Sequence, residues 1–139
     1  MSRLLVTGAA GFIGSHLCEA LLAAGHDVAG LDNFDPFYAR AVKERNLAAL
    51  RGRQGFRFAE SDLVRDPLPL EGVEAIIHLA ARPGVQPSLE DPASYMETNV
   101  TGTAPRSISK RARSDSLAIL AATRCAGLSH SVMAPLAER

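Results

Sequence analysis

Several residue types are scarce in this sequence of 139 residues, and each scarcity excludes a class of protein. Tryptophan is absent, and the two cysteines, Cys18 and Cys125, lie far apart with no C-x-x-C pair, so the sequence indicates neither a disulfide framework nor a zinc site. None of the four histidines has a second histidine three or four residues away, the spacing of a metal-binding pair on a helix. We therefore expect no metal site, and a reducing compartment.

Net charge and long apolar runs are missing as well. Fifteen basic and fifteen acidic side chains cancel, so nothing favours nucleic acid as a partner. No apolar stretch is long enough to span a bilayer, and Thr7 and Gly8 interrupt the first apolar run too early for a signal peptide. We expect a cytoplasmic protein of about one domain, with neither nucleic acid nor membrane as a partner.

The composition changes after Thr103. Residues 1–103 carry nine basic and thirteen acidic side chains, whereas residues 104–139 carry six and two. All seven aromatic residues lie at or before Tyr95. Because a shift of this kind can mark a tail or a change of origin within one chain, we treat residues 1–103 and residues 104–139 as separate regions.

The first region alternates short apolar runs with stretches of helical periodicity. The segments expected as strands are 4–6, 28–31, 56–60 and 75–80, and those expected as helices are 13–24 and 39–51. Alternating strands and helices favour an α/β fold, and right-handed connections make a doubly wound parallel sheet of about four strands the simplest topology.

Three glycines and one acid point to a dinucleotide. Gly8, Gly11 and Gly14 stand between the first strand and the first helix, where glycine lets a pyrophosphate approach backbone N–H groups at the helix N-terminus. Asp32 ends the second strand, near the expected spacing, and can accept hydrogen bonds from the adenosine ribose while repelling a 2′-phosphate. The pattern predicts a Rossmann-like sheet that prefers NAD to NADP. The alternatives are an ordinary tight turn and a turn-forming Asp32-Asn33 pair.

The remaining polar residues carry weaker signals. Asp62 follows the third strand, where such a sheet meets an adenine ring, but a helix cap or loop acid would look the same. Ser15 and His78 favour structural roles, as a helix N-terminal serine and a hydrogen-bonded core histidine. No spacing indicates a Ser-His-Asp triad or a nucleophilic cysteine.

Several of these segments also carry a family resemblance. The segments concerned are Thr7–Gly14, Leu31–Phe34, Asp62–Leu63, His78–Ala81 and Asn99–Thr103. Together they resemble the N-terminal NAD-binding region of the nucleotide-sugar epimerases and dehydratases, which belong to the extended short-chain dehydrogenases. Residues 84–92 are similar to the UDP-glucuronate and UDP-glucose 4-epimerases, but Gln86 stands where an arginine is common, which leaves the sugar open.

The resemblance implies an NAD site and, in the full-length family, a UDP-sugar as substrate. The residues to which it assigns a cofactor role are Gly8, Gly11, Phe12, Ile13, Gly14, Asp32, Asn33, Asp62, Leu63, Leu79, Ala80, Ala81 and Asn99. The glycine turn would hold the pyrophosphate, Asp32 and Asn33 the ribose, and Asp62 the adenine together with Leu63. The segment 79–81 would line the nicotinamide side, and Asn99 would hold the cofactor region together.

The resemblance implies no catalytic residue in this chain. The family's chemistry needs a tyrosine with a lysine four residues later, which lowers the tyrosine pKa so that it can act as a base. The two tyrosines, Tyr38 and Tyr95, are followed at that distance by Val42 and Asn99. We expect an NAD-binding part that is inactive in isolation. The alternatives are a non-catalytic NAD-binding module and a non-functional gene remnant.

Residues 104–139 do not match the family pattern. Pro105 should end the helix that begins near Tyr95, and residues 116–126 have the composition of a further helix. One hypothesis is that this tail is read in a shifted frame or derives from a damaged gene, and the alternative is a divergent natural tail. Without a fifth strand, residues 75–80 would form an exposed sheet edge, through which we expect self-association unless the tail covers it.

Overall fold

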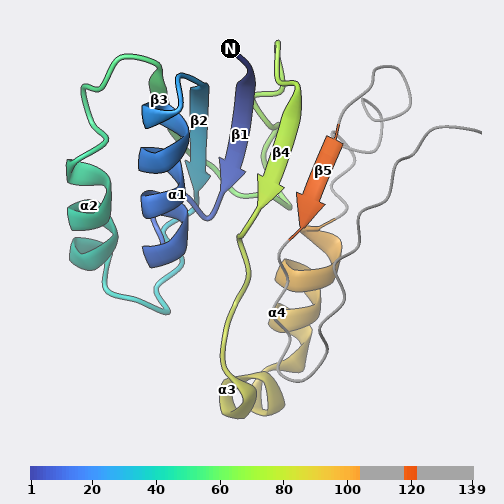
Figure 1. Ribbon diagram of the computed structural model, residues 1–139. Helices are drawn as coiled ribbons and strands as arrows, with labels where there is room; N and C mark the ends of the chain where they lie inside the picture. The colour runs from blue at the N-terminus through green and yellow to red at the C-terminus, as the bar shows by residue number, and fades with distance from the viewer. Residues whose placement is uncertain (104–117, 122–139) are drawn as a thin grey trace, which may run out of the picture.

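The computed structural model describes residues 1–103 and 118–121. These residues form a parallel sheet in the order β3-β2-β1-β4-β5, with helices packed against it (Figure 1). The strands are β1 (Arg3–Thr7), β2 (Asp27–Asp32), β3 (Phe56–Glu60), β4 (Ala75–His78) and β5 (Ala118–Ala121). The helices are α1 (Phe12–Ala23), α2 (Arg40–Ala48), α3 (Val85–Glu90) and α4 (Pro92–Met96), and α4 continues into the π-helix η1 (Glu97–Thr101). The predicted Rossmann-like α/β fold is confirmed.

The strand order reverses direction beside β1, which fixes where a ligand can bind. Leu5, in the middle of β1, pairs with Ala29 of β2 on one side and with Ile76 of β4 on the other. The chain therefore goes from β1 outward to β2 and β3, and then crosses back to β4. In open parallel sheets, the crevice at such a reversal, beyond the carboxyl ends of the strands, is the usual ligand site.

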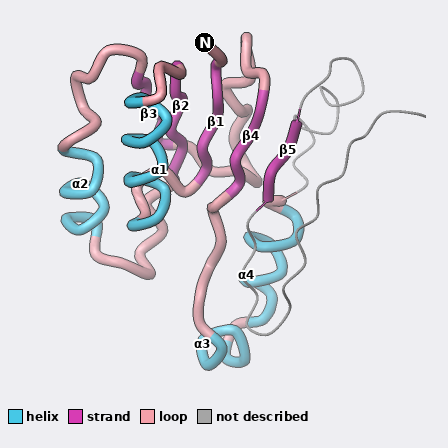
Figure 2. The backbone as a smooth tube through the Cα atoms, in the orientation of Figure 1, coloured by secondary structure: helices cyan, strands magenta, loops and turns pink. Residues whose placement is uncertain are grey.

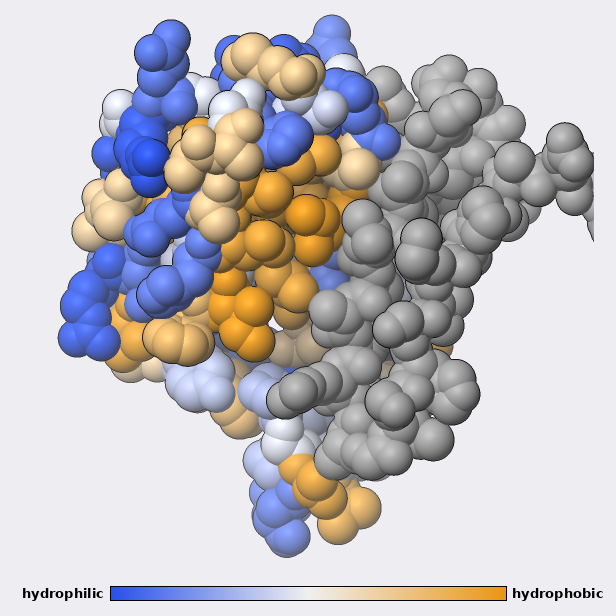
Figure 3. Space-filling model, viewed as in Figure 1, coloured by the Kyte–Doolittle hydropathy of each residue, from blue (hydrophilic) through white to orange (hydrophobic). Residues whose placement is uncertain are grey.

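Two apolar clusters hold the sheet between its covering layers. Leu5 and Ile76 face the long connection 61–74, whose leucines pack on this side without forming a helix. Val6 and Val28 face the opposite side, where α1 and α2 cover them. Apolar residues also gather at the surface in the middle of the face seen in Figure 3. After β4 the chain runs as a long loop to α3, and α4 then returns toward the sheet (Figure 2).

The helix expected in the tail is wrong in its described part, and the tail covers the edge of β4. Ala118–Ala121, expected within a helix, is a strand, and it pairs with β4 from Ala75 to His78. The exposed edge expected at β4 is therefore occupied by β5. The physical reason is that an apolar run of four residues suits a buried strand as well as a helix, and an unpaired strand edge favours the strand. Residues 104–117 and 122–139, which hold the rest of the predicted tail, lie outside the described residues.

The helical segment that follows β4 is short. It ends at Thr101, with a turn through Gly102 and Thr103, so it stops before Pro105, which lies outside the described residues. Within residues 1–103 and 118–121, no helix is both long and apolar enough to cross a membrane.

His78, at the end of β4, is the core histidine that the sequence predicts. Its side chain is buried, with Nδ1 2.8 Å from Thr7 Oγ1 and Nε2 3.3 Å from Thr103 Oγ1. Burial disfavours the charged imidazolium and lowers the pKa of His78 below its ordinary value. The folded chain therefore favours the neutral form of the His78 imidazole.

This predicts a pH dependence of stability. Below about pH 6.5, the ordinary value, the unfolded chain binds a proton at residue 78 that the folded chain resists, so the free energy of unfolding should fall as the pH falls. Urea unfolding between about pH 8 and pH 5.5 measures this slope, which His78→Gln should flatten. His16→Gln, which replaces an exposed histidine, is the matched control and should keep the slope. An unchanged slope in His78→Gln would contradict the prediction.

Candidate functional site

A cleft lies at the carboxyl ends of β1, β2, β3 and β4, at the reversal of strand order. It brings together nine of the thirteen residues predicted for the cofactor site. They are Gly8, Gly11, Asp32, Asn33, Asp62, Leu63, Leu79, Ala80 and Ala81. The other four, Phe12, Ile13, Gly14 and Asn99, do not line the cleft. The segments gather because parallel strands present all their carboxyl ends at one edge of the sheet.

The glycine turn forms the floor of the cleft and allows no side chain at two positions. Gly8 has a φ of 70°, and a Cβ there would lie 2.9 Å from the backbone nitrogen of Ala80. A Cβ on Gly14 would lie 2.1 Å from the carbonyl oxygen of Gly8, far inside van der Waals contact. Gly14 thus lets α1 pack against the turn, while Gly8 lets the loop after β4 approach it.

The first turn of α1 supplies backbone donors. No side chain caps this helix at Gly11, and the N–H groups of Phe12 and Ile13 have no hydrogen-bond partner among the residues that the structure describes. The side chains of Phe12 and Ile13 are exposed. Helix N-termini with free N–H groups favour anions such as a phosphate. Ser15, by contrast, is buried and donates its hydroxyl to the Phe12 carbonyl, a structural role.

Asp32 is buried and accepts three hydrogen bonds from its neighbours. Its Oδ1 accepts hydrogen bonds from the Phe34 N–H at 2.8 Å and from the Lys43 ammonium at 2.9 Å. Its Oδ2 accepts from the Ala10 N–H at 3.2 Å, so one carboxylate joins β2, the glycine turn and α2. Only 6% of the Asp32 side chain and 10% of the Lys43 side chain are exposed, which makes this a buried ion pair.

Lys43 escaped the sequence reasoning, although a signal for it exists. Lys43, Leu47 and Leu50 are spaced four and three residues apart, which places them on one helix face. Both leucines are fully buried, so the lysine occupies a core-facing position where a charge needs a partner. The ammonium also bears on cofactor choice, because it offsets the negative charge with which Asp32 would repel a 2′-phosphate.

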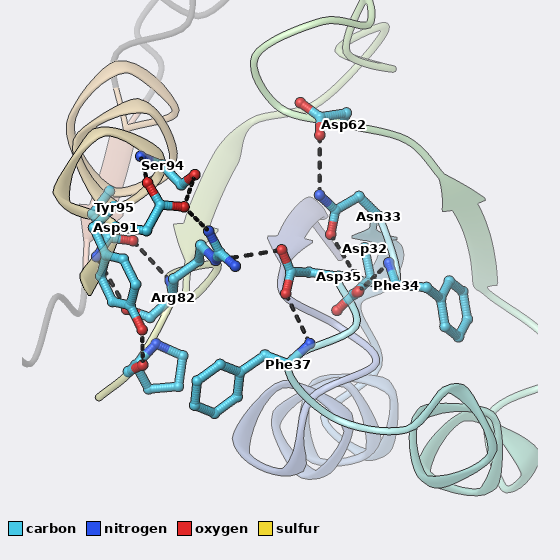
Figure 4. Close-up of polar contacts among 12 residues, drawn as sticks. Asp32, Asn33, Phe34, Asp35, Phe37, Asp62, Arg82, Asp91, Ser94 and Tyr95 are labelled. Carbon is cyan, nitrogen blue, oxygen red and sulfur yellow. Dashed lines mark hydrogen bonds and ion pairs between the residues drawn. The ribbon is translucent and has the colours of Figure 1, made fainter. Parts of the chain in front are cut away.

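Asn33 and Asp62 join the ends of the neighbouring strands β2 and β3 at the cleft (Figure 4). The Asn33 side-chain amide donates to Asp62 Oδ2 at 3.0 Å, and Asp62 Oδ1 accepts from the backbone N–H groups of Val64 and Arg65. Partial burial works against the charged form of Asp62, but these hydrogen bonds outweigh it and hold the pKa of Asp62 below its usual range. Asp62 therefore caps its own loop and also lines the cleft, and its contact with an adenine ring stays a prediction.

The loop after β4 is positioned by one hydroxyl and one amide. Thr7 Oγ1 accepts from the backbone N–H groups of Leu79 and Ala80, both at 3.2 Å. Further along, Asn99 Oδ1 accepts from the Arg82 N–H at 2.8 Å, while Asn99 Nδ2 donates to the Arg82 carbonyl at 3.1 Å. Asn99 thus holds the backbone that carries the cleft wall and does not reach the cleft itself.

Neither tyrosine has the geometry of a catalytic base in the described part of the chain. Tyr95 is buried, and its hydroxyl donates to the Pro83 carbonyl, which engages it structurally. Tyr38 lines the cleft with a largely exposed side chain, but Val42 follows it at the distance where the family has a lysine.

Known proteins with similar sequences agree with this geometry. The sequence pattern of the NAD dependent epimerase/dehydratase family matches residues 4–114. The chain belongs to this family. The match extends past Thr103, where the composition changes. A probable UDP-glucuronate 4-epimerase of Rhizobium meliloti is 41% identical over 107 residues, which cover 73% of this chain and 31% of that protein. The chain thus spans about a third of the length of the curated relatives it matches.

Solved structures of epimerases and dehydratases share the fold. UDP-glucuronic acid 4-epimerase from Bacillus cereus, in complex with UDP-glucuronic acid and NAD, superposes with a TM-score of 0.80 at 31% identity and covers 96% of this chain and 46% of that one. The dTDP-glucose 4,6-dehydratase DesIV from Streptomyces venezuelae, with NAD bound, has a TM-score of 0.62 at 40% identity, covering 73% and 33%. The predicted family membership is confirmed.

The close packing of Gly14 predicts that Gly14→Ala destabilises the fold. Alanine favours a helix over glycine by about 1 kcal/mol, but the contact of its Cβ with the Gly8 carbonyl should outweigh this by about 1–3 kcal/mol. Chemical unfolding measures the net change. Ala20→Gly, at an exposed position of α1, is the control that reports helix propensity alone. A Gly14→Ala variant as stable as the parent would show that the turn can yield.

The buried ion pair predicts that Asp32→Ala destabilises the fold by about 3–5 kcal/mol, because Lys43 is left charged and unpaired in the core. Adding Lys43→Met should recover part of this loss, since no buried charge then remains. The free energy of unfolding of both variants decides the matter. Glu60→Gln, which removes half of the exposed ion pair with Arg40, is the control and should change stability little. Equal losses in Asp32→Ala and in the double variant would contradict the pairing.

Proposed function

We propose that this chain is the NAD-binding part of a nucleotide-sugar epimerase or dehydratase of the UDP-sugar 4-epimerase type. One observation carries the proposal most strongly. The fold assembles nine predicted cofactor residues around one cleft at the reversal of strand order, above a turn that admits no side chain at Gly8 or Gly14. The relatives that carry NAD in their solved structures support the choice of cofactor.

The described residues fit each part of a dinucleotide. The free N–H groups at Phe12 and Ile13 suit the pyrophosphate, and Asp32 with Asn33 suits the ribose hydroxyls. Asp62 and Leu63 would flank the adenine, and the segment 79–81 would lie on the nicotinamide side. Bound NAD would supply a hydride acceptor and donor, while this chain's own residues would orient it and hold its charges.

Activity in isolation is not part of the proposal. A tyrosine paired with a lysine four residues later is missing among the residues that the structure describes, and the Tyr95 hydroxyl is engaged by Pro83. The first relative is about two and a half times as long, and its further length is where a substrate part and a catalytic pair would be found. The absent pair also favours a second candidate, a non-catalytic module that binds NAD.

Other partners and the location stay predictions. A UDP-sugar is the substrate we propose for the longer proteins of this type, and cytoplasmic location without a nucleic-acid partner remains an expectation from composition. Self-association through the sheet would use β5, because β5 pairs along the edge of β4. The division into a domain of residues 1–103 and a divergent or frame-shifted tail of residues 104–139 is likewise a proposal.

Cofactor binding tests the proposed function. Titration of the full chain with NAD and NADP in a calorimeter should show binding of NAD, and Asp32→Asn should weaken NAD roughly tenfold or more while weakening NADP less. Asparagine keeps the shape of the side chain but loses the charged acceptor for the ribose. Glu60→Gln, at the end of β3 and outside the cleft, should bind like the parent. A folded parent chain that binds neither dinucleotide would overturn the proposal.

Turnover separates the enzyme from the module. Incubation with NAD and UDP-glucuronate or UDP-glucose should give no C4 epimer on chromatography, because neither Tyr38 nor Tyr95 has a lysine four residues later to support general base catalysis. Epimer formation that Tyr95→Phe abolishes would instead make Tyr95 catalytic.

A further inference from the structure

Arg82 lies on the cleft wall in a setting that the proposed function does not use. It follows β4, and its guanidinium extends between two carboxylates that belong to different elements, Asp35 after β2 and Asp91 before α4 (Figure 4). Arg82 Nε is 3.5 Å from Asp35 Oδ2, and Arg82 Nη1 is 3.9 Å from Asp91 Oδ2. Arg82, on the wall after β4, is therefore linked by an ion pair to Asp35 on the opposite wall.

Hydrogen bonds hold the backbone of Arg82 and the tyrosine ring beside its guanidinium. Asn99 holds the Arg82 backbone on both sides, and the Tyr95 ring lies 5.3 Å from the guanidinium carbon. The Tyr95 hydroxyl in turn holds the Pro83 carbonyl. The arginine thus projects from an anchored wall.

The opposite wall is the loop that follows β2. Asp35 Oδ1 accepts from the Phe37 N–H at 2.9 Å and so shapes this loop, while Oδ2 is directed at Arg82. Phe37 and Tyr38 of the same loop line the cleft. A movement of Asp35 would therefore also move Phe37 and Tyr38, which line the cleft.

The ion pairs fall short of full contact. Arg82 Nε is buried and makes no hydrogen bond among the described residues, and 3.5 Å to Asp35 is longer than a good N–H···O bond. A buried donor without a partner is unfavourable and rare. A small movement of the Asp35 loop toward Arg82 would satisfy this donor and narrow the cleft at the same time.

We propose that Arg82 is a positioning residue that closes the cleft over a bound dinucleotide by drawing Asp35 and its loop onto the wall after β4. The inference rests on the proposed function. Bound ligand displaces water from the cleft, and the attraction between partly exposed charges grows as the surroundings become less polar. Ligand binding and ion-pair closure therefore favour each other, and opening of the clasp limits release of the ligand.

Direct capture of a phosphate by Arg82 is the competing role, and the charges around it argue against it. Asp35 and Asp91 both face the guanidinium, and Glu97 lines the same wall of the cleft, so the surroundings carry more negative than positive charge. A phosphate placed there would meet these carboxylates. A clasp between protein groups suits this balance better.

The kinetics of NAD release test the clasp on the full chain. In stopped-flow displacement, Arg82→Met and Asp35→Asn should each raise the dissociation rate of NAD about tenfold with little change in the association rate. The double variant should release NAD no faster than either single variant, because the two residues act as one unit. Arg82→Lys, which keeps the charge but loses Nε, should lie between parent and Arg82→Met and shows that the fold survives at this position.

Arg65→Met is the matched control, because it removes another positive charge from the cleft lining without touching the clasp. Any effect of Arg65→Met on the dissociation rate should add to that of Arg82→Met, because Arg65 is no part of the clasp. If Arg82 instead attracts the anionic cofactor, Arg82→Met and Arg65→Met will both slow association and Asp35→Asn will tighten binding. That result, or additive effects of Arg82→Met and Asp35→Asn, overturns the clasp.

Hydrogen exchange separates failure of the clasp from failure of the proposed function. If the parent chain does not bind NAD, the proposed function is wrong, and so is the part of the inference that concerns ligand release. The ion pair is then judged on the ligand-free chain, where Arg82→Met and Asp35→Asn should speed amide exchange at residues 35, 37 and 38 equally and without adding. Unchanged exchange in both variants shows that Arg82 does not hold this loop.

Discussion

Backbone packed against backbone at the turn between β1 and α1 is the constraint on which the site depends. Gly14 meets the carbonyl of Gly8, and Gly8 meets the backbone of Ala80, at separations that exclude a Cβ at either glycine. Strand β1, helix α1 and the loop after β4 can come together only because these positions carry no side chain. The floor of the cleft, the free N–H groups of α1 and the place of Leu79 all follow from that approach.

Much of the fold and most of the site could be predicted because their determinants are local. An apolar run that ends at a glycine specifies the turn after β1, and Asp32 falls at the end of β2 by counting along the chain. Parallel strands then bring Asp32, Asp62 and Ala80 to one edge without further information, since all their carboxyl ends point the same way. The place of these site residues therefore follows from the positions at which the strands end in the sequence.

The features that escaped prediction depend on partners distant in sequence. Ala118–Ala121 is a strand because β4 offers an edge to pair with, which its own four residues cannot specify. Arg82 acquires a role only through Asp35 and Asp91, each on a different element. Lys43 is the intermediate case. Its helical spacing indicates a core-facing position, but the sequence does not show that its partner is Asp32, a residue whose pattern points to a ligand.

The cleft lining that the structure describes runs from Gly8 to Thr98, and all of it precedes β5 in the chain. A growing polypeptide leaves the ribosome from its N-terminus, and its early segments can fold while later ones are still being made. The described lining therefore belongs to the segment that leaves the ribosome before β5. A dinucleotide that bound this segment before β5 joined the sheet would stabilise it by mass action.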